Sequence, residues 1–165
     1  MTVTSATPQS TPRFRLSPGA RRAVLTVHIA ASVGLLGDSA GFLAVALRGA
    51  TTGDPELAAA CWQLLEMFGF VFGIPLSLTA LVTGLTLGLG SKWGVLRYPW
   101  VTAKLLAIVS VMLVGALVIG PANTAMLDGD GGGETRLVAA GAYDVIVLAL
   151  ATGLSVYKPG RRRSR

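Results

Sequence analysis

The sequence predicts an all-α integral membrane protein, a bundle of four transmembrane helices with both termini in the cytoplasm. Hydrophobic residues make up 52% of the 165-residue chain and charged residues only 13%, about half the charge of an ordinary soluble domain. A soluble domain of this size could not bury so much apolar side chain. The apolar residues also gather in four long runs, and each run supplies the ~20 residues that cross a hydrocarbon core.

The four runs predict helices at residues 23–47, 56–89, 98–120 and 134–157 of a transmembrane domain that covers residues 21–158. The second run is long for one span and holds Pro75 in its middle. It is therefore expected to tilt, to kink at Pro75 or to project beyond the bilayer. The third is expected to stop at Pro121, because a proline inside a helix removes a hydrogen bond and clashes with the preceding turn.

Two tails flank this domain. Residues 1–20 are rich in Thr, Ser and Pro, a composition that predicts disorder. Residues 159–165 form a basic tail that contains four arginines. The apolar run after residue 22 is longer than the ~7–15 residues of a signal-peptide core, so a signal peptide is not expected.

The distribution of Lys and Arg predicts the orientation. Four of them lie before the first predicted helix, two in the 90–97 connector and five after the last helix, whereas Arg48 and Arg136 alone lie on the other side. Lys and Arg concentrate in cytoplasmic loops, which places both termini inside and indicates a multi-pass protein of the cytoplasmic (inner) cell membrane. Trp100 and Tyr157 are expected at the cytoplasmic interface and Trp62 near the outer one, as parts of aromatic belts.

Charge and cysteine content narrow the classes of partner. The net charge is +6, but the basic residues flank apolar runs, where they meet anionic lipid head groups rather than nucleic acid. A single cysteine, Cys61, excludes an internal disulfide and a CxxC metal site, so no metal site is expected. The expected partners are the lipid bilayer and, as protein partner, a second copy of the chain or another membrane protein.

Glycines recur at the spacing that lets helices approach closely in lipid. They form three pairs four residues apart: Gly37 with Gly41, Gly69 with Gly73, and Gly84 with Gly88. A compact four-helix bundle accounts for these pairs without any conduit.

The polar residues inside the spans are the candidates for function. A charged group at bilayer depth costs at least ~2.5 kcal/mol, so each needs a partner, a water-filled cavity or a role. At ~1.5 Å per residue, the predicted helices place His28 and Lys104 near the cytoplasmic boundary and the acidic groups in the outer half. The candidate intramembrane polar site therefore comprises His28, Lys104, Asp38, Asp144 and Glu66.

A purely structural interpretation of these residues is also open. His28 can hydrogen-bond a neighbouring helix, since imidazole is both donor and acceptor. Lys104 can extend its ammonium group to the cytoplasmic head groups, and Glu66 is close enough to the outer interface to be solvated. Asp38 and Asp144 are short and deep, so they either pair with a cation or stay neutral.

Three stretches resemble a known family. They are VHIAASVGLLG at residues 27–37, KWGVLRYPWV at residues 92–101 followed by Lys104, and LSVYKP at residues 154–159. Together they resemble an uncharacterised bacterial family of small four-helix integral membrane proteins with a domain of unknown function, over about residues 22–160. A looser resemblance reaches the copper-resistance-D-like and membrane protoporphyrinogen oxidase families, which pair a helix-1 histidine with a helix-3 lysine, here His28 and Lys104. That resemblance implies haem or a porphyrin as cofactor, although the chain has no second histidine.

Three classes of function remain open at this point. The first is binding of an apolar ligand, or an accessory role in a membrane complex. The second is an enzyme or redox component that acts on a porphyrin, a quinone or a lipid-like substrate, in which Lys104 and His28 hold an anionic group. The third is transport of protons, ions or metals. No motif assigns a reaction or a catalytic residue.

Overall fold

The computed structural model describes residues 16–89 and 99–157, and these form a helical bundle without a strand among them. The first span is α1 (Pro18–Thr51). The second is continuous through α2 (Pro55–Met67), the π-helix η1 (Phe68–Gly73) and α3 (Ile74–Leu89). The third runs through α4 (Pro99–Val114), the π-helix η2 (Gly115–Ile119) and α5 (Gly120–Leu127), and the fourth is α6 (Glu134–Tyr157).

Within the described residues, four helices are long and apolar enough to cross a membrane. The predicted all-α, four-span fold is therefore confirmed. The side of the membrane on which the termini lie stays a prediction. The expected connector at 90–97 and most of the two tails lie outside the described residues.

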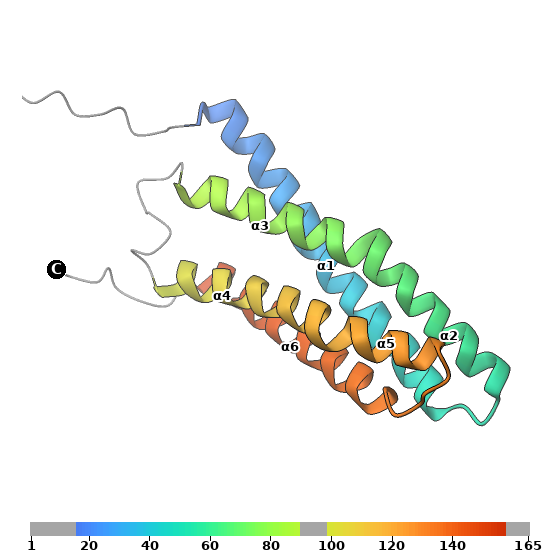
Figure 1. Cartoon of the computed structure of the whole chain (residues 1–165). Coiled ribbons are helices and arrows are strands. Elements are labelled where there is room, and N and C mark those ends of the chain that lie inside the picture. Colours follow the sequence, from blue (N-terminus) through green and yellow to red (C-terminus); the bar gives the residue numbers. More distant parts are fainter. Residues whose placement is uncertain (1–15, 90–98, 158–165) are drawn as a thin grey trace, which may run out of the picture.

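The four spans form a closed ring of neighbours. α1 packs against α2, α3 and α6, α4 packs against α3 and α6, and α5 packs against α2 and α6. Figure 1 shows the resulting bundle, in which α1 begins at the same end where α3 ends, α4 begins and α6 ends. We call this the basic end, because Arg21 and Arg22 lie in the first turns of α1. The other is the opposite end.

The first two spans are longer than the bilayer requires. α1 has 34 residues and the second span has 35, so each is about 51 Å long or more. Even at a tilt of ~40°, ~26 residues cross a 30 Å core. Both spans therefore project beyond the hydrocarbon, one of the outcomes expected for the second span.

α1 also extends past both predicted ends. Ser17 caps its N-terminus by accepting a hydrogen bond from the Ala20 N–H at 3.2 Å, and Pro18 occupies the first turn. A proline there costs nothing, because the N–H that it lacks would have no helical partner. At the other end the helix continues to Thr51, and the Asp54 carboxylate then caps α2 by accepting from the N–H groups of Glu56 and Leu57.

The two prolines inside the spans are each preceded by a π-helix. The residue before Pro75, Ile74, donates its N–H to the carbonyl of Gly69, and the residue before Pro121, Gly120, donates to the carbonyl of Gly115. Both bonds span five residues instead of four, the pattern of a π-helix. The third span was predicted to stop at Pro121, and this was wrong, since the helix continues to Leu127. The wider turns accommodate a proline that would otherwise break the helix.

Two apolar clusters form the core. The first lies toward the opposite end and joins all four spans through Phe42, Ala46, Trp62, Leu65, Ala122 and Leu137. The second lies toward the basic end and contains Leu35, Val111 and Leu148. Asp38 lies between the two clusters along α1, and Asp144 lies between them along α6.

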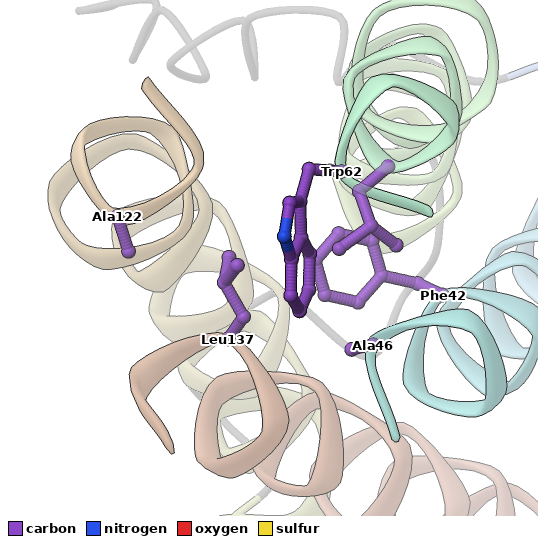
Figure 2. Packing of buried hydrophobic residues seen from close by; sticks show 6 residues of the cluster. Phe42, Ala46, Trp62, Ala122 and Leu137 are labelled. Atoms are coloured by element: carbon purple, nitrogen blue, oxygen red, sulfur yellow. The ribbon is translucent and has the colours of Figure 1, made fainter. Parts of the chain in front are cut away.

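Trp62 belongs to the first cluster rather than to an interfacial belt. Its side chain is only 5% exposed, and Figure 2 shows its indole ring between Phe42 and Ala46 of α1 and the helices that carry Ala122 and Leu137. The predicted place of Trp62 in the outer aromatic belt was therefore wrong. The ring fits because Gly49 has no side chain: a Cβ there would lie 2.7 Å from the indole.

Two further glycines allow an aromatic side chain of another helix to pack closely against the backbone. A Cβ at Gly41 would lie 2.9 Å from the ring of Phe68, and one at Gly141 would lie 3.1 Å from the ring of Phe42. By contrast, Gly37 and Gly69 have open space around them. The pairs predicted from their spacing thus contribute unequally.

Replacement of Gly49 by alanine should destabilise the bundle, because the added methyl group would overlap the buried indole of Trp62. Overpacking of this kind typically costs about 1–3 kcal/mol. The measurement is the unfolding free energy in detergent, with Gly37→Ala on the same helix as control, since a Cβ at Gly37 meets nothing within 4 Å. Equal stability of the two variants would contradict the close packing of Trp62 on α1.

Candidate functional site

His28 connects α1 to α3 near the basic end. Its Nδ1 lies 3.1 Å from the carbonyl oxygen of Ala80 and 3.0 Å from the hydroxyl oxygen of Thr83. A carbonyl oxygen only accepts hydrogen bonds, so Nδ1 carries the proton and donates. Thr83 donates its own hydroxyl proton to the carbonyl of Thr79, which leaves its oxygen able to accept from His28. Among the described residues, Nε2 of His28 therefore has no hydrogen-bond partner.

Gly84 makes the position of the imidazole ring possible. A Cβ on Gly84 would lie 3.1 Å from Cε1 of His28, tighter than ordinary van der Waals contact. The ring is half-buried against α3, and it is oriented by two acceptors that are one turn or less apart on the same helix. His28 is thus a fixed side chain.

Lys104 connects α4 to α6 at the same end. Its ammonium group donates a hydrogen bond to the Ser155 hydroxyl at 2.8 Å and lies 5.5 Å from the centroid of the Trp100 ring. A lysine that extended only to the lipid head groups would not need a partner on a neighbouring helix. The geometry places the charge at the helix–helix interface, where an aromatic face and a hydroxyl group both stabilise it.

These two connections form a single polar layer. A Cβ at Gly141 would touch Phe42 and Leu43, so Ser155, fourteen residues further along α6, lies level with His28 on the antiparallel α1. The layer therefore takes one or more polar residues from each span: His28 from α1, Thr83 from α3, Lys104 and Trp100 from α4, and Ser155 from α6. We call these five residues the basic-end site. The nearest acidic residues along the helices, Asp38 and Asp144, lie ten and eleven residues away from His28 and Ser155, about 15 Å or more. The layer therefore has a positive local charge.

Sequence reasoning identified His28 and Lys104 but missed Thr83, Ser155 and Trp100 as members of one site. Thr83 and Ser155 are common in transmembrane helices, where their hydroxyls usually bond the preceding turn, as both also do here. The antiparallel order of the predicted helices could have identified Thr83 and Ser155, since each hydroxyl lies at the same predicted depth as the ionisable residue that it bonds on the adjacent span.

Asp38 and Asp144 form a second polar layer near the middle of the bundle. α1 and α6 are antiparallel, and a Cβ at Gly141 would touch Phe42 and Leu43. Three residues further along α6, Asp144 therefore faces the region of Asp38. Asp144 is 6% exposed and lies near the centre of the 24-residue α6.

The carboxyl oxygens of this pair lack partners. Oδ1 of Asp38 and Oδ1 of Asp144 are both buried and accept no hydrogen bond in the described chain. Asp38 adjoins η1, where a Cβ at Gly73 would lie 3.5 Å from its Oδ2. An ionised carboxylate at this depth costs at least ~2.5 kcal/mol, so two adjacent ones without a cation are strongly disfavoured.

Glu66, the fifth predicted residue, lies apart from both layers. Its side chain is exposed on the outer surface of α2, as expected for a solvated or partner-facing group rather than one in the interior. Asn123 of α5, which sequence reasoning did not single out, is buried and has an unpartnered Oδ1. It adjoins Ala122 of the first cluster and so lies nearer the opposite end than the acidic pair.

A groove between α1 and α6 is distant from the basic-end site. It has a volume of about 390 Å³ and lies between α1 and α6 at the opposite end, where Leu47, Ala50, Glu134 and Val138 line it. Small side chains of α6 form one side of the groove. Neither polar layer therefore lines this groove.

Residues 22–159 match the family described as "Predicted integral membrane protein (DUF2269)". The chain belongs to this family. The predicted resemblance to an uncharacterised membrane family is thereby confirmed, and the matched segment of this DUF2269 protein includes both polar layers. No curated protein and no solved structure matches the chain. The family description supplies a membrane location but no activity.

A double-mutant cycle should detect the bond between His28 and Thr83 in the DUF2269 protein. His28→Ala combined with Thr83→Val should give a coupling energy of about 0.6 kcal/mol, and at most about 1.7, as for hydrogen bonds between membrane helices. The measurement is unfolding in detergent for the four members of the cycle.

Thr86 provides the matched control for this cycle. Its hydroxyl donates to the carbonyl of Val82 at 2.7 Å on its own helix, so His28→Ala with Thr86→Val should show no coupling. Equal coupling at Thr83 and Thr86 would mean that His28 does not bond Thr83.

Proposed function

We propose that this DUF2269 protein binds an apolar ligand that carries an anionic head group, and that the basic-end site holds the head group. The observation that supports the proposal is the convergence of His28 and Lys104, with Thr83, Ser155 and Trp100, from α1, α3, α4 and α6 into one layer. An accessory role in a membrane complex follows from the same site, if the ligand is a cofactor or lipid that the complex shares.

The chemistry of the layer favours an anion. The ammonium group of Lys104 has three N–H donors, and a hydrogen bond to a charged group contributes about 1.5–3 kcal/mol. His28 is held by Nδ1, so its Nε2 faces a ligand as an acceptor when neutral and as a donor when protonated. The apolar remainder of the ligand would lie along the helices.

The proposed orientation places the basic-end site at the cytoplasmic face of the cytoplasmic membrane. Arg21 and Arg22 lie in the first turns of α1 at this end, and the positive-inside rule assigns such flanks to the cytoplasm. Ligands with carboxylate or phosphate heads would then enter from the inner leaflet.

Binding of a long-chain fatty acid tests the proposal. In nanodiscs of zwitterionic lipid, palmitate should bind the wild-type protein, whereas methyl palmitate, which has no charge, should bind at least tenfold more weakly. Lys104→Gln should weaken palmitate binding by about tenfold, which corresponds to ~1.4 kcal/mol. Isothermal titration calorimetry gives both dissociation constants.

The control for this test is Arg136→Gln. Arg136 is a cation on α6 near the opposite end, so its removal changes the net charge by the same amount but should leave palmitate binding unchanged. Equal losses in Lys104→Gln and Arg136→Gln would mean that palmitate responds to overall charge, and equal binding of the methyl ester would contradict an anion site.

A redox or porphyrin-binding role is the second candidate, and the orientation of His28 favours it. A histidine that ligates a metal almost always donates its other ring N–H to a carbonyl or carboxylate, and Nδ1 of His28 donates to the carbonyl of Ala80. Its Nε2 would thus hold the iron of a bound haem, and Lys104 would hold a porphyrin carboxylate. Bound haem would supply one-electron chemistry.

An absorption spectrum tests this second candidate. Protein purified in mild detergent, after expression with added haem precursor, should show a Soret band that changes with dithionite and is lost in His28→Ala. Glu66→Gln, which alters an exposed polar group outside both layers, should retain the band. A featureless spectrum of the wild-type protein would reject haem and leave the anionic-ligand proposal standing.

A further inference from the structure

We propose that Asp38 and Asp144 form a proton-binding site in the middle of the membrane, in which at least one of the two carboxyl groups carries a proton in the folded protein. This inference does not depend on the ligand at the basic-end site. It rests on the burial of the pair, its missing hydrogen-bond partners and its place between two apolar clusters.

The burial of Asp144 is the first argument. Its side chain is more than nine-tenths buried and its Oδ1 has no hydrogen-bond partner in the described chain, and the same oxygen of Asp38 is also buried and unpartnered. Buried acceptors almost always have a donor. A proton on one carboxyl group creates an O–H donor at this point, whereas two ionised groups offer acceptors alone.

The two core clusters isolate the pair along the bundle axis. Toward the opposite end, Phe42 and Leu137 of the first cluster lie on the same helices as the pair, and Leu137 is fully buried. Toward the basic end, Leu35 and Leu148 of the second cluster lie one turn from Asp38 and Asp144. Apolar side chains on both sides hold the carboxyl groups in a low-dielectric layer, where an ionised carboxylate is disfavoured.

No described cation is positioned to neutralise the pair. The second span carries no ionisable residue from η1 to the end of α3, and its Glu66 is exposed two residues before η1. On the other helices, the groups nearest the pair are far along the helix or point outward. They are His28 and Arg48, each ten residues from Asp38, Arg136, eight residues from Asp144, Tyr143, whose side chain is exposed, and Lys104, level with Ser155.

We assign a proton rather than a metal ion to the site because the pair supplies only two carboxyl groups. A hard cation such as Ca²⁺ takes six to eight oxygen ligands, and the described residues contain no group of three or more His, Cys, Asp or Glu that could hold a metal ion. The nearby Ser77 hydroxyl already donates to the carbonyl of Ile74. Two carboxyl groups alone suffice for one shared proton.

Carbon-13 NMR of the protein labelled at its aspartate side-chain carboxyl carbons tests the proposal. At pH 7 in nanodiscs, we expect at least one carboxyl signal at the position of the protonated form. The Asp38→Asn, Asp144→Asn double variant should lose that signal, because an amide has the shape of a protonated carboxyl group but cannot titrate.

The control is Asp54→Asn, which removes an exposed carboxyl group and keeps an N-terminal capping side chain on α2. It should retain the protonated signal. The proposal is overturned if every aspartate is ionised at pH 7, or if the protonated signal persists in the double variant. It is equally overturned if sodium chloride, compared with choline chloride at constant pH, abolishes the signal, since the pair would then bind a metal cation.

The pH dependence of protein stability tests the proposal independently if the double variant is poorly expressed. A group that holds a proton more tightly in the folded than in the unfolded state stabilises the fold at low pH, and this contribution is lost as the pH rises through its titration in the folded state. The melting temperature of the wild-type protein should therefore fall as the pH rises from about 4, where a free aspartate loses its proton, and it should fall less in Asp144→Asn alone. An equal fall in both proteins would overturn the proposal.

Discussion

The packing of side chains into glycine positions along α1 and its neighbours sets the depth of every polar group in this protein. Trp62 against Gly49, Phe68 against Gly41 and His28 against Gly84 fix the second span on α1 at three levels. Phe42 against Gly141 fixes α6 on α1. In lipid there is no hydrophobic drive between helices, so close van der Waals contact of this kind must supply much of the association energy. A shift of one turn along either interface would separate His28 from Thr83 and Asp38 from Asp144.

This register divides the interior into alternating polar and apolar layers. From the basic end, the order is the basic-end site, the second cluster, the acidic pair and the first cluster. The positive and acidic layers are about 15 Å apart along the helices, with Leu35, Val111 and Leu148 between them. Lys104 therefore forms no ion pair with Asp38 or Asp144, and the charge of each layer has to be stabilised by groups within that layer. Hydroxyl groups and an aromatic ring stabilise the charge in the basic-end site, whereas the acidic pair has no hydrogen-bond donor as partner among the described residues.

The π-helices explain how two prolines coexist with long transmembrane spans. Each π-helix ends two residues before its proline. Each therefore places a wider turn near the middle of its span. Because η1 contacts α1 and η2 contacts α6, these turns also border the helices that carry Asp38 and Asp144. Turns of π-helix occur frequently at functional sites. Their position thus agrees with a site at this depth.

The sequence by itself determined that the chain is an all-α membrane protein with four spans, because the length and apolarity of each run are local properties that the bilayer constrains directly. It also identified the interior residues that need an explanation, since ionisable side chains at bilayer depth are costly wherever they occur. Tertiary structure decided which of them belong together. Glu66 and Asp38 have similar predicted depths, yet one faces outward and the other faces α6, because helix rotation depends on contacts such as those at Gly41 and Gly141. The burial of Trp62 and the passage of the third helix through Pro121 likewise depended on a partner surface and a π turn, neither of which hydropathy records.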